Sequence, residues 1–411
     1  MWGVFVILSA MKRVLIFAMS YYPRFVGGAE VAIKEITDRI EDIEFHVVTL
    51  RFDKNLPKQE KIGNVVVHRI GYAKDDPSPE DLKKFPLHLM KHWYQFGAFW
   101  KARELQRRHG FDATWAMMAH SAGIPAGMFK QAYPEVPYVL TLQEGDPPEQ
   151  IEAQMKKVWR LFKQAFTSAD YLQAISTFLM NWGKRMGFSG EAVLIPNAVN
   201  IAHFQKEVPD TQLAEVQEKI GKKDGETWLI TTSRLVHKNA VDDVIRALPE
   251  VEDTVHFLIL GTGPDEDMLK ELAEELGVRE RVHFYGFVDH AEIPAFYKAC
   301  DIFIRPSRSE GMGNSFVEAM AADIPVIATQ EGGIADFLFD SVRNPEQKTT
   351  GWAVDADSPQ QIAEAIKDIQ AHPEKVEEVI EGARDMVVEK YDWEVVAADM
   401  RKLFGKALDT N

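Results

Sequence analysis

The stretch SEGMGNSFVEAM, residues 309–320, decides how this chain folds. It follows a short apolar strand candidate at 301–304, and its two glycines, Gly311 and Gly313, form a tight loop before an apolar helical pattern. A strand, a glycine loop and a helix in this order form one repeat of a parallel sheet that helices cover. In such sheets ligands bind outside the carboxyl ends of the strands, where these loops lie. The stretch is therefore a candidate binding loop as well as a fold signal.

Two glutamates mark this loop and its helix. Glu310 lies on the loop, and Glu318 falls about one turn inside the helix, which Asn314 or Ser315 can cap. One glutamate at a helix start can serve only to compensate the helix dipole. The pair favours binding, because carboxylates accept hydrogen bonds from vicinal hydroxyls. We expect Glu318 to bind a ribose and Glu310 a hexose, while the amides between them face phosphate.

The same alternation of strand and helix runs through the whole chain. Strand candidates lie at 13–18, 45–50, 64–70, 112–116, 137–142, 170–175 and 192–195, and then at 227–232, 255–260, 281–284, 301–304 and 325–328. Residues 196–226 interrupt the series with turn residues and a polar helical stretch, so a boundary between lobes is expected at 199–204. We predict an α/β fold of two Rossmann-like lobes facing across a cleft.

Length and composition support two lobes and exclude some partners. A chain of 411 residues exceeds what one hydrophobic core usually serves. The formal net charge of -16 repels a polyanion, and the basic residues form no nucleic-acid-binding signature, so nucleic acid is not an expected partner. The single cysteine, Cys300, excludes an intramolecular disulfide and a thiolate-rich metal site, which favours a reducing, cytoplasmic location.

The beginning of the chain is apolar over residues 2–10 but has no basic region before it, as a signal peptide would. The segment from Met11 reads as a natural start, so residues 1–10 are interpreted as an extension upstream of it. No apolar run approaches the roughly 18 residues that span a bilayer.

Two further loops follow predicted strands. Gly27 and Gly28 lie between the opening strand and a helical pattern, where missing side chains would let a phosphate approach the backbone. The alternative is a helix start that only needs flexible residues. Arg234 and Lys238 stand at the end of strand 227–232, where two cations could neutralise a pyrophosphate. The alternative there is a solvated basic turn.

In their order and spacing these features resemble the retaining glycosyltransferases of family 4 (GT4), which have the GT-B fold. The resemblance covers nearly the whole chain. It rests on GGAE at 27–30, IPNAVN at 195–200 with Phe204, the basic turn 233–238, GTGP at 261–264, YGFV at 285–288, RPS at 305–307, the two glutamates separated by seven residues, and Gly332-Gly333.

The resemblance implies a division of the chain and a set of site residues. Residues 11–198 would form the acceptor-side lobe, 199–390 the nucleotide-sugar lobe, and 391–411 a helix that packs back on the first lobe. Arg234 and Lys238 would bind the donor pyrophosphate, Glu318 its ribose and Glu310 the transferred sugar. The full predicted donor site is Gly27, Gly28, Arg234, Lys238, Val288, Gly311, Gly313, Asn314 and Glu318, with the backbone near Val288 reading the base.

The first lobe departs from the family pattern at two histidines. His120 lies a few residues later than the family's first histidine, and the segment 140–146 has none. His120 is predicted as a second catalytic residue beside Glu310, since it could reach the donor sugar. The alternative is a histidine that only forms a structural hydrogen bond.

The implied reaction moves a hexose from a nucleotide diphosphate sugar to an acceptor hydroxyl, with retention of configuration. The acceptor would be a glycan, a lipid-linked molecule or a small molecule. No metal and no cofactor is expected, because the basic turn takes the electrostatic role of a metal. The alternatives are a sugar-nucleotide epimerase or phosphorylase on the same fold, and a non-catalytic sugar-nucleotide-binding protein.

Residues 83–109 form a basic, aromatic segment within an acidic chain. Seven lysines and arginines oppose only Glu104, and six aromatic residues lie among them. Such a helix could touch an anionic membrane at its inner face, as a peripheral contact, or an anionic acceptor. The alternative is a helix that packs its aromatic residues on the first sheet and leaves its basic residues in solvent.

Overall fold

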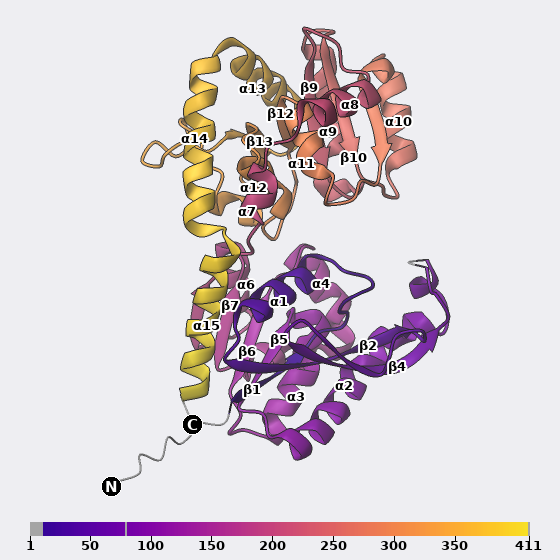
Figure 1. Ribbon diagram of the computed structural model, residues 1–411, viewed down its shortest axis with the longest axis vertical. Helices are drawn as coiled ribbons and strands as arrows, with labels where there is room; N and C mark the ends of the chain where they lie inside the picture. The colour runs from indigo at the N-terminus through magenta and orange to yellow at the C-terminus, as the bar shows by residue number, and fades with distance from the viewer. Residues whose placement is uncertain (1–10, 79, 410–411) are drawn as a thin grey trace.

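In the computed structural model, which describes residues 11–78 and 80–409, each of two lobes has its own sheet (Figure 1). The first has eight strands in the order β3-β4-β2-β1-β5-β6-β7-β8. They are β1 (Lys12–Phe17), β2 (Ile43–Asp53), β3 (Gln59–Ile62), β4 (Val65–Lys74), β5 (Ala113–Met117), β6 (Tyr138–Leu142), β7 (Tyr171–Ala174) and β8 (Glu191–Leu194). All neighbours pair in parallel except β3 and β4.

The second sheet has six parallel strands in the order β11-β10-β9-β12-β13-β14. They are β9 (Thr227–Thr232), β10 (Val255–Leu260), β11 (Val282–Gly286), β12 (Ile302–Arg305), β13 (Val326–Thr329) and β14 (Trp352–Val354). The α/β prediction is confirmed, and each of the twelve predicted strands has a counterpart. Two strands were not predicted: β3 is polar and alternates exposed with half-buried residues, and β14 has only three residues.

Helices cover both faces of each sheet because successive strand residues point to opposite faces. On the first sheet α1 and α15 cover one face, and α2, α3, α5 and α6 the other. On the second, α9, α10 and α13 cover one face, and α11, α12 and α14 the other. The helices are α1 (Gly28–Arg39), α2 (Leu87–His109), α3 (Ile124–Ala132), α4 (Pro148–Met155), α5 (Trp159–Thr167), α6 (Thr177–Arg185), α7 (Ile201–Gln205), α8 (Asp210–Ile220), α9 (Val241–Ala247), α10 (Glu266–Glu275), α11 (Ile293–Ala299), α12 (Asn314–Ala321), α13 (Pro359–Ala371), α14 (Pro373–Lys390) and α15 (Trp393–Asp409).

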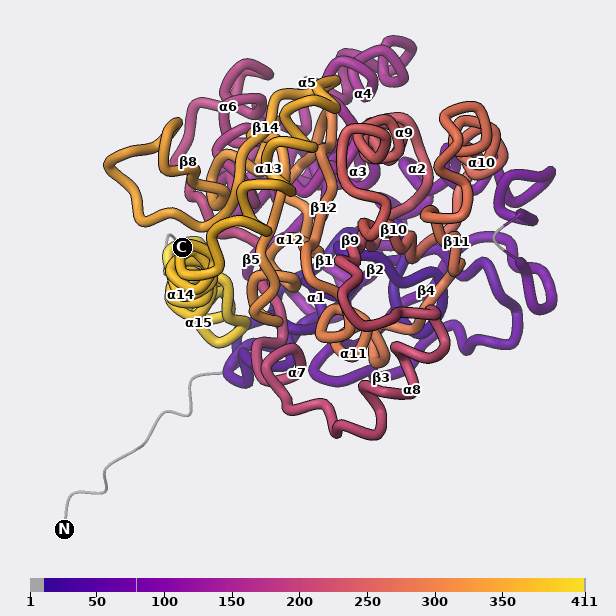
Figure 2. The backbone as a smooth tube through the Cα atoms, turned by 90° about the horizontal axis from the view of Figure 1, so that it is seen from above, coloured from indigo at the N-terminus to yellow at the C-terminus, as the bar shows by residue number. Residues whose placement is uncertain are grey.

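The last two helices run along both lobes. In Figure 1, α14 lies beside the second lobe and α15 continues in the same direction beside the first, and Figure 2 shows the two nearly end-on. The ring of Phe404 packs against Phe45 and Trp115, with centroids 5.7 and 5.2 Å apart. Arg39 donates to Glu394 at 2.8 Å, so α15 is fixed to α1 as well.

The chain crosses between the lobes at two neighbouring points. The backbone N–H of Val199 donates to the carbonyl oxygen of Tyr391 at 2.9 Å, and Val199 also pairs with Asp392. The first crossing lies in the predicted boundary segment and the second between α14 and α15. The proposed extension, residues 1–10, and residues 410–411 lie outside the described residues. No helix within residues 11–78 and 80–409 is long and apolar enough to cross a membrane.

A histidine pair lies on neighbouring strands of each sheet, buried in the first sheet and half-buried in the second. Nδ1 of His46 lies 2.9 Å from Nε2 of His68 on β2 and β4, and His256 and His283 stand in the same relation at 3.0 Å on β10 and β11. Burial lowers the pKa of His68 and that of His283 to about 4, and nearby positive charge adds to this. These histidines are therefore neutral in the folded protein at neutral pH.

We expect the protein to lose stability as the pH falls from about 6.5 toward 4. In the unfolded chain His68 takes up a proton near pH 6.5, whereas in the folded protein it does so only near pH 4. Between these two pH values the unfolded chain binds more protons than the folded protein, so the free energy of unfolding decreases as the pH falls. The shift at His68 corresponds to roughly 3 kcal/mol. Urea unfolding at pH 7 and pH 5 should show a smaller pH dependence in His68→Phe than in the wild type. If the free energy of unfolding changed equally between pH 7 and pH 5 in both proteins, His68 would not be the source of the pH dependence.

Candidate active site

A cleft of about 1270 Å³ lies between the lobes, and the carboxyl ends of both sheets face it. From the first lobe it is lined by the start of α1, the loop after β6 and the crossing segment 197–200. From the second lobe it is lined by the loop after β11, the end of β12, the loop 310–313 and the start of α12. Segments more than a hundred residues apart therefore build one cavity.

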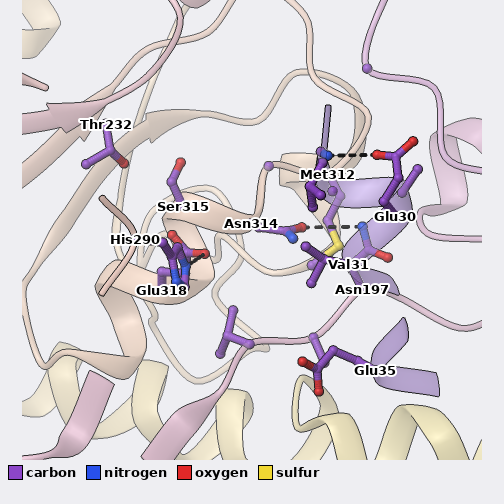
Figure 3. Close-up of a pocket in the computed structure, with 18 of the residues that line it drawn as sticks. Glu30, Val31, Glu35, Asn197, Thr232, His290, Met312, Asn314, Ser315 and Glu318 are labelled. Atoms are coloured by element: carbon purple, nitrogen blue, oxygen red, sulfur yellow. Dashed lines mark hydrogen bonds and ion pairs between the residues drawn. The ribbon is translucent and has the colours of Figure 1, made fainter. Parts of the chain in front are cut away.

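The structure brings most of the predicted donor residues to this cleft. The residues that line it and were predicted are Gly27, Gly28, Val288, Glu310, Gly311, Gly313, Asn314 and Glu318. Figure 3 shows Asn314 and Glu318 pointing into it from α12, with Glu30 on the opposite wall. Residues of the sequence motifs thus lie on both walls of the cleft.

The start of α12 differs from the prediction. Neither Asn314 nor Ser315 caps the helix: Asn314 is its first residue, and Gly313 holds the cap position with a φ of 87°. A side chain at Gly313 would also collide with Phe316 and with Arg305, whose atoms would lie 2.6 and 2.8 Å from its Cβ. The glycine is therefore needed both for its left-handed backbone and for space. Asn314 accepts instead from Asn197 of the crossing segment, at 3.4 Å (Figure 3).

Glu310 is a buried carboxylate paired with an arginine that sequence reasoning missed. Nη2 of Arg305 donates to Oε2 of Glu310 at 3.1 Å, and Nη1 donates to the hydroxyl of Ser315 at 2.8 Å and to the carbonyl of Thr232 at 3.2 Å. The guanidinium lies 4.2 Å from the ring centroid of Phe316. Arg305 thus holds β9, the loop and α12 together and fixes one oxygen of Glu310.

Glu318 has a histidine partner that was also missed. Nε2 of His290 lies 3.1 Å from Oε1 of Glu318 (Figure 3), and this contact raises the pKa of His290. The His290 ring stacks on His203 of α7 with centroids 5.6 Å apart, and His203 bonds to the carbonyl of His290 at 3.2 Å. Glu318 is therefore linked through the loop after β11 to the segment that crosses between the lobes.

The two predicted cations do not line the cleft. The side chain of Arg234 is exposed. Lys238 reaches toward the first lobe, where Nζ donates to the carbonyl oxygen of Gly145, a residue that does line the cleft. Lys238 therefore ties the lobes together beside the cavity, which the sequence alone could not show.

His120 does not line the cleft either. It lies in a π-helical turn, Ala119–Gly123, and its Nδ1 is 3.4 Å from Oε1 of Glu144. Glu144 is buried, lines the cavity and accepts from the backbone N–H of Ala119 at 2.6 Å. The carboxylate of Glu144 is thus fully buried between Ala119 and His120, and it is Glu144, not His120, that is among the residues lining the cleft.

The lobes touch closely at the glycine loop. A Cβ on Gly311 would lie 2.2 Å from the carbonyl oxygen of Glu144 in the other lobe, and one on Gly333 would lie 2.0 Å from the carbonyl oxygen of Gly311. The backbone N–H of Thr177 donates to Asp336 across the same boundary at 2.6 Å. These glycines are required because backbone packs on backbone there. Among the described residues, no group of three or more His, Cys, Asp or Glu is placed to hold a metal ion.

Two family models match consecutive parts of the chain. The model for "Glycosyltransferase Family 4" matches residues 26–203, and the model for "Glycosyl transferases group 1" matches residues 214–386. Between them they include both walls of the cleft. The chain belongs to glycosyltransferase family 4.

Relatives of this family 4 glycosyltransferase match over more than half of its length, and one of them over nearly all of it. An uncharacterised glycosyltransferase of Methanocaldococcus jannaschii is 23% identical over 390 residues, which cover 95% of this chain and 97% of the relative. A GDP-mannose-dependent alpha-(1-6)-phosphatidylinositol monomannoside mannosyltransferase of Mycolicibacterium smegmatis is 29% identical over 247 residues, 57% of this chain and 62% of the relative.

Solved structures confirm that this family 4 glycosyltransferase has the GT-B fold. Sucrose-phosphate synthase from Thermosynechococcus elongatus superposes with a TM-score of 0.79 at 18% identity, covering 97% of this chain and all of the other. HepE of Anabaena, in complex with UDP and glucose, superposes with a TM-score of 0.73 at 20% identity, covering 96% of this chain and all of the other.

Proposed function

We propose that this glycosyltransferase moves a hexose from a nucleotide diphosphate sugar to an acceptor hydroxyl, with retention of configuration and without a metal ion or cofactor. The observation that carries the proposal is the placement of Glu310 and Glu318 on one loop and helix facing the cleft. Two carboxylates a helical turn or more apart suit the hydroxyls at the two ends of a sugar nucleotide. A GDP-mannose-dependent relative and a structural neighbour that binds UDP support a donor of this class.

The donor is proposed to lie along the second lobe. Glu318 accepts from its ribose, Glu310 from its hexose, and the loop beside Val288 reads its base. The backbone N–H groups at the start of α12 and at Gly28 face the pyrophosphate in this arrangement. Gly27, whose own N–H donates to Glu30 at 2.7 Å, leaves space for the phosphate because it has no side chain.

Charge on the leaving pyrophosphate is proposed to be met by Lys238 and Arg234. Lys238 already bonds to the backbone of Gly145 at the edge of the cavity, and a phosphate oxygen is a stronger acceptor than that carbonyl. Arg234 is exposed, and its side chain has no hydrogen bond to any described residue, so it is free to turn to the donor. His120 is proposed to act through Glu144, because it contacts the Glu144 carboxylate at 3.4 Å and Glu144 lines the cleft whereas His120 does not.

A thermal-shift screen against UDP-, GDP- and ADP-sugars tests this proposal. One donor class should raise the melting temperature by several degrees at about 100 times its dissociation constant, since it binds only the folded state. The shift and the transfer activity should persist in EDTA. Glu318→Gln should reduce the shift, because an amide accepts less strongly than a carboxylate, whereas Glu331→Gln, an exposed residue outside the cleft, should not.

Three results would contradict the proposal. If no sugar nucleotide raises the melting temperature, the proposed class of donor is wrong. If activity is lost in EDTA and restored by magnesium, the reaction is not independent of metal. Consumption of the donor without any acceptor would favour an epimerase.

A further inference from the structure

Helix α2 is apolar on two faces. Leu87, Tyr94, Ala98, Ala102 and Leu105 are buried against the first sheet and α3. On the other side lie Phe85, just before the helix, and Leu89, Trp93, Phe96 and Trp100, whose exposed fractions run from 41% to 78%. Their spacing of four, four, three and four residues places them along one face of the helix. This face is called the aromatic stripe. The expectation that all these aromatic residues pack on the sheet is therefore wrong for four of them.

Positive charge lies on the same segment as the stripe, and Arg103 and Arg107 fall closest to its face of the helix. Lys83, Lys84, Lys91, Lys101, Arg103, Arg107 and Arg108 lie on the same segment, which has Glu104 as its one acidic residue. Glu104 pairs with Lys101 and Arg108, whereas Lys84, Lys91, Arg103 and Arg107 form no ion pair with a described residue. The guanidinium of Arg103 lies 5.1 Å from the ring centroid of Trp100, so one cation sits against the stripe itself. Because the whole chain has a net charge of -16, this cluster of basic residues is a local feature of α2 and the residues before it.

These features fit a lipid surface better than a second copy of the chain. A two-fold pair through the stripe would set the cations of one copy against those of the other, which costs free energy, and the one acidic residue of the segment, Glu104, is already paired with Lys101 and Arg108. Tryptophan and phenylalanine flanked by lysine and arginine match the boundary between acyl chains and anionic headgroups, where the rings enter and the cations meet phosphate.

The stripe begins at the cleft end of the first lobe. Arg24, on the loop that enters the cleft wall at Tyr22 and Val26, donates to Asp53 at 2.5 Å and to Asp76 at 2.6 Å. It also donates to the carbonyl of Pro77, at 3.3 Å, in the segment that leads to Phe85. The cleft wall and the first residues of the stripe are thus held at the same end of the sheet.

We propose that the aromatic stripe and its cations dock this glycosyltransferase on an anionic lipid bilayer, with the mouth of the cleft beside the membrane surface. The docking also specifies the proposed function, because it names a molecule held in the bilayer as the class of acceptor. Only this choice of acceptor rests on the proposed function. Contact is peripheral, through one helix face and not through a spanning helix.

Vesicle flotation tests the docking. The full chain should float with phosphatidylcholine vesicles that contain about one third phosphatidylglycerol, and much less with phosphatidylcholine alone, because each lysine or arginine near an anionic surface adds about 1 kcal/mol of attraction, or about fivefold. High salt should weaken the binding. Phe96→Ser with Trp100→Ser should lower the partition coefficient at least about tenfold, as should Arg103→Glu with Arg107→Glu, the two cations nearest the stripe.

A matched control reverses two exposed cations elsewhere, Lys367→Glu with Lys390→Glu on α13 and α14. Its partition coefficient should lie much closer to that of the wild type than to those of the stripe variants. All variants should keep the melting temperature and the donor-induced shift, which shows that they fold. The docking would be overturned if the wild type did not float at low salt or if the stripe variants bound vesicles as well as the wild type. It would also be overturned if the wild type were a dimer and the stripe variants were monomers. Flotation without any donor-induced shift would leave the docking standing and remove the proposed function.

Discussion

Replacing Glu310 with glutamine should lower the transfer rate about 10²- to 10³-fold while changing donor affinity little. In the proposed reaction Glu310 accepts hydrogen bonds from the transferred hexose, and these strengthen as positive charge develops on the sugar. Glutamine keeps the shape and can still accept from Arg305, but it removes the negative charge. The measurement is kcat with the donor that the thermal-shift screen identifies.

The control for this variant is Glu331→Gln, an exposed residue close to the same loop that does not line the cleft. Its kcat should equal that of the wild type. The donor-induced shift of Glu310→Gln should stay near the wild-type value, whereas its own melting temperature should fall, because the buried guanidinium of Arg305 loses its charged partner. If the donor-induced shift persists and kcat is unchanged, Glu310 has no part in the chemistry.

Arg305→Met should destabilise the folded protein by about 3–5 kcal/mol. Methionine fills part of the same volume, but it leaves the buried carboxylate of Glu310 without its partner and frees the carbonyl of Thr232. Urea unfolding of the wild type and the variant gives the difference directly. An effect below about 1 kcal/mol would show that solvent already screens the pair.

A double-mutant cycle separates the pair from the other contacts of Arg305. In Arg305→Met with Glu310→Gln the buried charge is gone, so the double variant should recover part of the loss, with a coupling free energy of about 1–3 kcal/mol. Arg305→Lys is the second control, because lysine keeps the charge but cannot donate to Thr232, Ser315 and Glu310 from one planar group. Additive single effects would mean that Arg305 acts through its packing on Phe316.

The sequence predicted the strands and loops well because their signals are local. Apolar runs of four to six residues define the buried strands, and glycines mark the loops where the backbone needs a left-handed conformation or close contact. The polar strand β3 lacks such a run, and β14 is too short to show one. Gly313 was overlooked as the cap because Asn314 and Ser315 are the usual capping types.

The side-chain partners in the cleft could not be predicted in the same way. Arg305 directly follows three apolar residues of a strand, so its sequence context signals only a strand end. Whether Lys238 points into the cleft or to Gly145 depends on how the two lobes meet, and periodicity within one lobe carries no such information. The buried face of α2 could not be predicted for a related reason. The helix has apolar residues on both faces, so periodicity does not show which of these residues the sheet covers.

The packing of α15 on the first lobe has a consequence for synthesis of the chain. Phe404 covers Phe45 and Trp115, so a surface made by the first third of the sequence is closed by its last twenty residues. The nascent first lobe therefore keeps an apolar face open while the entire second lobe is being translated. Only after the ribosome has released residues 393–409 can that face be buried, which makes the last helix the final step in completing the first lobe.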